Sequence, residues 1–410
     1  MLLKAVTAGG EFSSFERASQ MLDVLADVQM SGMQVARLTE EIGNELVAVR
    51  DERADRHRRR EFPSEASTPV PIACVETDGG RLQTRAADGP RGVHEPEWKE
   101  SKVGCLWRME GATFSEDPHP DPPRCFRDPE HVQRLVREIK NVTSPHADRP
   151  ELDPKALKSR KRASSAGASE DRPWPPKRVY RTAVATLRDV HGFGPLLAAE
   201  AQRRGFYNAQ RQVFLGDGDH KNWIVHKTHF PHFTAVTDFV HVTAYLYQAA
   251  GAVTNSFAAQ WEQYEAWLID CWQGRVAGVL EQLRDWRQRL DPPAAGSQSQ
   301  EPLEVGDDRD PQTIVAQVIT YLQNNAGRMN YPEYRRQGLP VTSCLVESLI
   351  KQFNQRVKGT EKFWSRPDNA EAILQVRAAL LSDDDRLREH ICSRPGRATR
   401  RRLQPANSRR

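Results

Sequence analysis

Three acidic residues stand where their side chains could hold metal ions. Asp78 in VETDGGRL and Asp217 in VFLGDGDHKNW each end an apolar, β-branched run, and Glu347 in VTSCLVESLIKQF lies on an amphipathic helical pattern. Carboxylates at strand ends and on a helix can meet in one cleft, and Mg²⁺ or Mn²⁺ takes oxygen ligands of this kind. We therefore expect a carboxylate triad that supports two-metal phosphoryl transfer.

The prediction depends on the three acids being considered together. A single Asp after an apolar run is usually a turn residue, and a single acid on a helix is usually solvated. Asp219 competes with Asp217 for the middle position. Asp217 is preferred because it directly follows the apolar run, with Gly216 and Gly218 allowing close approach of a ligand.

The helix that carries Glu347 separates its residues by face. One stripe is apolar, and the adjacent stripe is polar and comprises Glu347, Lys351, Asn354 and Lys358. A metal-binding acid followed by lysines on one stripe suits a substrate with phosphates, so Lys351 and Lys358 are candidate nucleic-acid contacts. An ordinary solvated helix face has the same spacing.

Histidines crowd the region after Asp217 and raise zinc as an alternative; they are His220, His226, His229, His232 and His241. No cysteine pair and no HExxH pattern accompanies them, so the match to a zinc site is poor. His241 follows Asp238 as DFVH at the start of a helix. It can orient a phosphate or bond an active-site acid, or be a structural histidine.

Periodicity predicts an α/β fold with a mixed sheet flanked by helices. We expect a strand over ACVETD, a tight turn at Gly79 and Gly80, an antiparallel partner over RLQTR, and a third strand in VGCLWRM. Further strands and helices alternate after VYRTAVAT. A meander followed by alternation belongs to an α/β layer.

Around this core we expect three other regions. Residues 116–176 are rich in proline and charge and predict a flexible excursion, with one helical piece near 132–139. Residues 252–330 predict an all-α insertion whose tryptophans form its core. Residues 376–410 read as a basic tail.

Residues 1–60 predict a helical region with a helix-turn-helix layout. Ser31 is placed as the N-cap of the second helix, which would bring Arg37 near DNA. An ordinary helical hairpin is the alternative, since several glutamates soon follow on that helix.

Composition limits the class of protein. There are 59 Lys and Arg against 55 Asp and Glu, a formal charge of +4, so any nucleic-acid surface must be local. Six scattered cysteines predict reduced thiols, and no apolar run approaches a membrane span, so a cytoplasmic protein without a membrane partner is expected. Nucleotide-binding loops and serine-hydrolase elbows are absent from the sequence.

Four sequence blocks resemble bacterial insertion-sequence transposases of the DDE class, most closely those with a Mutator-like, RNase H-like catalytic domain interrupted by helices. They are VETDGGRLQTR with GVHEPEWKESKVGCL, GFGPLLAAEAQRRGFYNAQRQVFLGDGDHKNW, FPHFTAVTDFVHVTAYLYQAA, and GLPVTSCLVESLIKQFNQRVKGTEKFW. The resemblance covers most of residues 70–375.

This resemblance implies a metal-dependent enzyme that cuts insertion-sequence ends and joins the free 3′-hydroxyl to target DNA, acting at the nucleoid as a homo-oligomer on paired ends. The family's acids fall on Asp78, Asp217 and Glu347, and its [CD]xxH element on Asp238 and His241. RVKGTEKFW would bring Arg356, Lys358 and Trp364 near DNA. Departures from the family pattern at Asp219 and His220, and the long excursion around Pro118 to Pro176, leave a truncated or domesticated, non-catalytic DNA-binding derivative as an alternative. An RNase H-like nuclease that cuts without joining is a further alternative.

Overall fold

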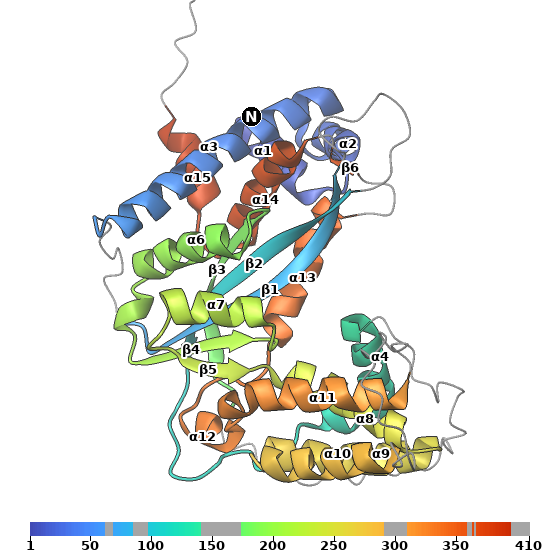
Figure 1. The fold of residues 1–410 in the computed structure, drawn as a ribbon. Helices are drawn as coiled ribbons and strands as arrows, with labels where there is room; N and C mark the ends of the chain where they lie inside the picture. The colour runs from blue at the N-terminus through green and yellow to red at the C-terminus, as the bar shows by residue number, and fades with distance from the viewer. Residues whose placement is uncertain are drawn as a thin grey trace, which may run out of the picture.

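The computed structural model describes residues 1–61, 69–84, 97–140, 174–290, 310–358, 363–364 and 366–394, with the side chains of 140, 344–347 and 363 excepted. These residues form one mixed sheet, helices on both of its faces, and a separate helical layer below (Figure 1). The α/β class with a mixed sheet flanked by helices, predicted from the sequence, is confirmed.

The sheet has the strand order β3-β2-β1-β4-β5, and a short β6 pairs with the far end of β1. Strands β1, β2 and β3 form an antiparallel meander, and β4 and β5 run parallel to β1. The bounds are β1 Ile72–Thr84, β2 Glu97–Glu110, β3 Lys177–Thr186, β4 Arg211–Gly216, β5 Thr234–Thr237 and β6 Phe363–Trp364.

Strand β1 corrects one prediction. It runs straight through Gly79 and Gly80, which pair with Lys102 and Ser101 of β2, so these glycines do not form a hairpin turn. Residues 81–84 of RLQTR are therefore the end of β1 and not its partner, whereas the strand predicted in VGCLWRM is confirmed as part of β2. An ideal Cβ at Gly79 would lie 3.5 Å from the Glu100 carboxylate, which is an ordinary contact distance.

Each face of the sheet has its own core. On one face Phe193 and Leu197 of α6 and Trp223 of α7 pack over Val75 and the other residues of this cluster. On the other face α8 and α13 pack against residues such as Cys74 and Leu215, and this core continues into the helical layer. The bounds are α6 Val190–Arg203, α7 His220–His229, α8 Phe239–Val253 and α13 Cys344–Val357.

The first and last helices of the chain pack together at the top of Figure 1. Helix α3 lies against α14, and α14 also packs on β3. The N-cap predicted at Ser31 is confirmed, since its hydroxyl accepts a hydrogen bond from the Gln34 backbone and the Gln34 side chain accepts one from the Ser31 backbone. The bounds are α1 Leu2–Glu11, α2 Phe15–Ala26, α3 Gly32–Arg58, α14 Pro367–Leu381 and α15 Arg386–Ser393.

The prediction of a basic tail from residue 376 is wrong for residues 376–394. They belong to α14 and α15, where Val376 and Leu387 are buried, and Arg394 bonds Glu41 and Glu45 of α3. Residues 395–410 lie outside the described part of the chain.

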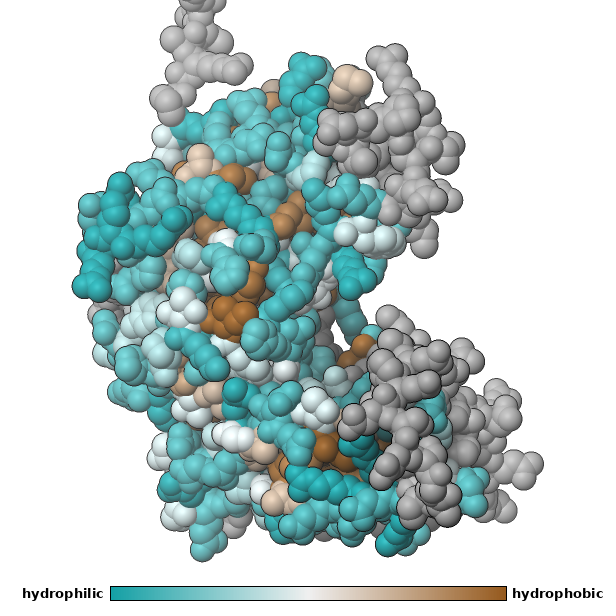
Figure 2. Space-filling model, in the orientation of Figure 1, coloured by the Kyte–Doolittle hydropathy of each residue, from teal (hydrophilic) through white to brown (hydrophobic). Residues whose placement is uncertain are grey.

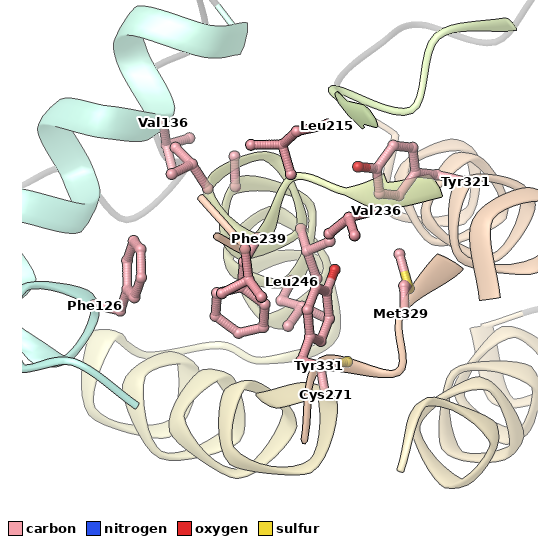
Figure 3. Packing of buried hydrophobic residues seen from close by; sticks show 14 of the residues in the cluster. Phe126, Val136, Leu215, Val236, Phe239, Leu246, Cys271, Tyr321, Met329 and Tyr331 are labelled. Atoms are coloured by element: carbon pink, nitrogen blue, oxygen red, sulfur yellow. The ribbon is translucent and has the colours of Figure 1, made fainter. Parts of the chain in front are cut away.

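The lower layer consists of α9 to α12 together with α8 and α4 (Figure 1). Its tryptophans are buried as predicted, with Trp267 and Trp272 fully enclosed. Figure 3 shows Phe239 and Leu246 of α8 meeting Tyr331 and Cys271 in this core. The bounds are α4 Pro129–Lys140, α9 Phe257–Trp272, α10 Val276–Leu290, α11 Pro311–Asn325 and α12 Tyr331–Arg336.

Residues 116–140 are part of this layer, so the prediction of a flexible excursion is wrong there. The Asp117 carboxylate binds the fully buried Arg335 guanidinium, and Tyr264 donates a hydrogen bond of 2.8 Å to the Phe126 carbonyl. The helical piece predicted near 132–139 is confirmed as α4. Residues 141–173, and the 291–309 loop, lie outside the described residues.

No helix in the described ranges combines the length and the apolar character that crossing a membrane requires. The five cysteines with described side chains are free thiols.

Gly104 of β2 tests the packing of α6 on the sheet. A Cβ at Gly104 would lie 2.6 Å from Leu197 Cδ1 and 2.9 Å from Phe193 Cζ, so Gly104→Ala is expected to destabilise the protein by about 1–3 kcal/mol through overpacking. Gly278→Ala is the control, because nothing lies within 4 Å of its Cβ position in α10 and alanine favours helix. Urea unfolding measures both, and equal midpoints would contradict the packing.

Candidate active site at the ends of three parallel strands

One row of paired residues crosses strands β1, β4 and β5. Thr77 of β1 pairs with Gly216 of β4, and Gly216 pairs with Thr237 of β5. The next residue in each case is an aspartate: Asp217 and Asp238 directly follow β4 and β5, whereas Asp78 lies within β1. The register of the sheet therefore brings three carboxylates to adjacent positions at the carboxyl ends of β4 and β5, where ligands of α/β sheets bind.

The same three residues share a face of the sheet. Side chains alternate along a strand, so Asp78 follows the face of Cys74, Asp217 that of Leu215, and Asp238 that of Val236. All three apolar residues belong to the core beneath α8. In Figure 3, Leu215 and Val236 lie on the side of the sheet occupied by α8.

Asp217 organises the turn after β4. Its Oδ1 accepts hydrogen bonds from the Asp219 backbone at 2.8 Å and from Asn222 Nδ2 at 2.7 Å. Gly218 has φ +98°, and a Cβ there would lie 2.5 Å from Tyr321 Cε2, so only glycine fits this turn. Among the described residues both donors to Asp217 use Oδ1, which leaves Oδ2 as a possible metal ligand.

Asp219 has a different task. Its side chain caps α7 by accepting a hydrogen bond of 2.7 Å from the Lys221 backbone, and the residue is exposed. An N-cap accounts for a carboxylate at this position without a metal.

Asp238 is completely buried and is fixed from several sides. It accepts hydrogen bonds from the Val240 and Ser343 backbones and from the Ser343 hydroxyl, and Nδ1 of His241 lies 3.1 Å from Oδ2. Burial raises the pKa of Asp238, and the nearby His241 and the Ser343 bonds only partly offset this effect. Asp238 therefore joins β5, α8 and the start of α13.

Helix α13 carries the third predicted acid. Its N-cap Ser343 is bound to Asp238, and further along the helix Asn354 Oδ1 lies 3.6 Å from a Cβ built at Gly80 of β1. Glu347 lies one turn after Ser343, so its backbone is next to the strand edge. The Glu347 side chain lies outside the described residues, and whether it meets Asp78 and Asp217 stays a prediction.

A pocket of about 260 Å³ opens beside this edge. It is lined by Ile139, Asp217, Gly218, Asp219, His241, Tyr245 and Tyr321. The rings of Tyr245 and Tyr321 stack at 3.7 Å, and the Tyr321 hydroxyl donates to the Asp217 carbonyl at 2.9 Å. Carboxylates, an imidazole and phenol rings thus meet between the sheet and the helical layer.

Two residues of the helical layer hold the Asp217 turn and were not foreseen from the sequence. Asn325 of α11 accepts a hydrogen bond of 3.0 Å from Trp223 Nε1 and donates one of 2.9 Å to the Tyr321 carbonyl. Arg328 lies over the Trp223 ring. Asn324 and Asn325 are the same residue type, so the sequence does not show which of them is functional. Only the face of the helix on which each lies distinguishes the buried Asn325 from the exposed Asn324.

The predicted nucleic-acid contacts divide into two groups. Arg37, Lys351 and Lys358 are exposed, and Lys351 pairs with Glu138 of α4 at 2.7 Å. The predictions for Arg356 and Trp364 are wrong, since both side chains are buried. Arg356 donates to the Gly9 carbonyl and packs over Phe15 and Trp364, so it joins α13 to the N-terminal helices.

The histidines do not gather around a metal. In the described part of the chain no group of three His, Cys, Asp or Glu side chains is placed to hold one. His226 instead bonds the Phe233 carbonyl at 2.9 Å, and burial lowers its pKa. For Mg²⁺ or Mn²⁺, the described donors that fit are the oxygens of Asp78 and Asp217, which follow the last paired residues of β1 and β4.

Comparison with known protein families gives no match for this sequence. Comparison with curated proteins gives no match either.

Replacing Asn325 tests the support of the Asp217 turn. Asn325→Ala leaves the buried Trp223 indole N–H without its acceptor, so a loss of about 1–3 kcal/mol in unfolding free energy is expected. The neighbouring Asn324 is exposed, and Asn324→Ala is expected to leave the unfolding free energy within about 0.5 kcal/mol of wild type. Similar losses in both variants would contradict the role of Asn325.

Asp238 predicts a pH dependence of stability. Because its folded pKa is raised, the folded protein binds a proton at higher pH than the unfolded chain does, and the resulting stabilisation is lost as pH rises through the folded pKa. The unfolding free energy of wild type minus that of Asp238→Asn is therefore expected to increase from about pH 7 to about pH 4. Urea unfolding across this range measures it, and a flat or opposite trend would refute the raised pKa.

Proposed function

We propose that this chain is a DNA transposase of the DDE class. In this proposal it cuts DNA at insertion-sequence ends and transfers the free 3′-hydroxyl into target DNA. The observation that carries the proposal is the register of β1 against β4, with Asp78 and Asp217 following the paired Thr77 and Gly216. Two carboxylates at adjacent positions of neighbouring parallel strands suit metal-dependent phosphoryl transfer.

The sheet supports an RNase H-like catalytic domain as part of this proposal. A three-stranded antiparallel meander is followed by two strands parallel to the first, with helices on both faces. Residues 252–330, with helices α9 to α11, would be the insertion that separates the second acid from the third. Their contacts to the Asp217 turn give such an insertion a physical function at the site.

In the proposed mechanism Asp78, Asp217 and Glu347 would hold Mg²⁺ or Mn²⁺. When bound, such ions would supply activation of a water or a 3′-hydroxyl and stabilisation of the leaving oxygen. The backbone and Asn222 bonds to Oδ1 of Asp217 fix this carboxylate before substrate arrives. Preorganised ligands of this kind need no rearrangement during reaction.

His241 has a separate role. Its Nδ1 is engaged by the buried Asp238, so Nε2 is the ring nitrogen that can bind a phosphate oxygen or a water in the pocket. Asp238 is then a positioning residue and not a metal ligand, because its oxygens are already taken by Ser343, Val240 and His241.

The proposed partners are transposon-end DNA, target DNA and further copies of the same chain, since coupled strand transfer needs two ends held together. The proposed place of action is the cytoplasm, at the nucleoid. Exposed Lys351, Lys358 and Arg37 are the proposed phosphate contacts that remain from the sequence prediction.

Cleavage and strand transfer of DNA carrying the inverted repeats that flank the gene test the proposal. Asp78→Asn and Asp217→Asn are expected to lower both reactions in Mg²⁺ or Mn²⁺ by more than about 100-fold, because each removes a charged metal ligand. Asp310→Asn, which keeps an N-cap on α11, is the control and is expected to act like wild type.

Other outcomes select the alternatives. Wild-type activity in Asp78→Asn would overturn the catalytic proposal. Cleavage without joining would favour the nuclease, and tight DNA binding without cleavage would favour a non-catalytic derivative.

A further inference from the structure

A carboxylate held between two lysines lies next to the candidate site in the sheet register, on the face opposite to that of Asp78 and Asp217. Glu100 of β2 binds Nζ of Lys102 through Oε1, and its Oε2 accepts from Lys221 Nζ at 3.1 Å. The Lys102 side chain has an exposure of only 10%, whereas the exposures of Glu100 and Lys221 are 43% and 49%. Lys102 is thus the buried cation of the cluster, and Glu100 is accessible to solvent.

The register of the sheet locates this cluster. Lys102 is the cross-strand partner of Gly79, the residue after Asp78, and Glu100 is the partner of Arg81. Gly104, two residues along from Lys102, faces α6, so Lys102 and Glu100 lie on the α6 and α7 side of the sheet. Lys221 comes from the first turn of α7, directly after the Asp217 turn.

The bridge passes over β1 at Gly79. Oε1 of Glu100 lies 3.5 Å from the position of a Cβ at Gly79, which is an ordinary contact distance. Strand β2 and helix α7 thus meet across β1 at the residue that follows Asp78.

Positive charge exceeds negative charge in this cluster. Arg81, Lys102 and Lys221 carry three positive charges, and Arg81 is close enough to act on the pKa of Lys221. Glu100 and the nearby Asp219 supply the negative charges. Burial alone would raise the pKa of Glu100, but the hydrogen bonds from the two lysines outweigh it, so the net pKa is lowered. The ionised Glu100 carboxylate is thus bound by two lysine ammonium groups, which are donors that an anion requires.

We propose that Lys102 and Lys221 form a subsite for a backbone phosphate of the nucleic acid, and that Glu100 fills this subsite until DNA displaces it. The proposal deepens the function proposed above and rests on it, since the phosphate would belong to the strand whose neighbouring phosphodiester reaches Asp78 and Asp217. A phosphate accepts the same lysine hydrogen bonds as a carboxylate, with two donors on one anion.

Binding of a fluorescent DNA duplex, followed by anisotropy in EDTA over about 50–200 mM NaCl, tests the subsite without requiring cleavage. Glu100→Gln is expected to bind about two- to fivefold more tightly than wild type, because an exposed ion pair no longer has to be broken. The double variant Lys102→Met, Lys221→Met is expected to weaken binding and to reduce the salt slope by about two. Circular dichroism and thermal unfolding establish that each variant is folded.

Glu265→Gln is the matched control. Glu265 also forms an ion pair, with the single cation Arg127 at 3.3 Å on the helical layer, and its replacement removes the same charge as Glu100→Gln does. It is expected to bind DNA as wild type does. Equal effects of Glu100→Gln and Glu265→Gln, or no DNA binding by any variant, would each overturn the subsite.

A separate cleavage assay distinguishes this proposal from the enzymatic one. If Glu100 and the lysines control DNA binding as expected while Asp78→Asn cleaves like wild type, the subsite stands and the catalytic proposal fails. If Asp78→Asn is inactive but the Glu100 and lysine variants bind like wild type, the catalytic proposal stands and the subsite fails.

Discussion

The parallel pairing of β4 between β1 and β5 is the constraint on which the rest of the site depends. One row of residues, from Thr77 through Gly216 to Thr237, sets both the position and the face of the three aspartates that follow. A shift of one residue in any strand would turn its aspartate to the opposite face, under α6 and α7. The cores on the two faces prevent this shift, because Val75 and Phe214 fit one cluster and Cys74 and Leu215 fit the other.

Segments far apart in the chain then stabilise the strand edge from two directions. From the helical layer, Tyr321 and Asn325 bond the Asp217 turn and the Trp223 ring beside it. From α13, Ser343 bonds Asp238. Figure 2 shows a mostly hydrophilic face that is hollowed between the sheet with its helices and the lower layer. The candidate site is therefore bonded both to the helical layer and to α13.

Local sequence patterns correctly predicted those features that depend on interactions between residues close together in the chain. The apolar run before Asp217, the N-cap at Ser31 and the tryptophan stripe all depend on neighbours within a few residues, and the structure agrees with each. Predictions failed where a distant partner decides the outcome. Gly79 and Gly80 have the sequence of a turn, but they pair with Lys102 and Ser101 of β2 inside a strand. Arg356 was predicted near DNA, but it is packed against Phe15 and Trp364. The sheet register places Asp78 and Asp217 at adjacent positions, whereas the side chain of Glu347 is not described, so the convergence of the three carboxylates stays a prediction.

The packing of α3 on α14 has a consequence for how the chain folds during synthesis. Helices α1 to α3 leave the ribosome before α14 and α15, and residues of α14 and α15 cover part of the apolar surface of α1 and α3. The apolar faces of α1 and α3 must therefore wait, exposed, until the whole sheet and the helical layer have been translated and Pro367–Leu381 follows. A chaperone that holds these helices during translation would protect the nascent protein from aggregation, and a prematurely ended chain would keep that surface uncovered.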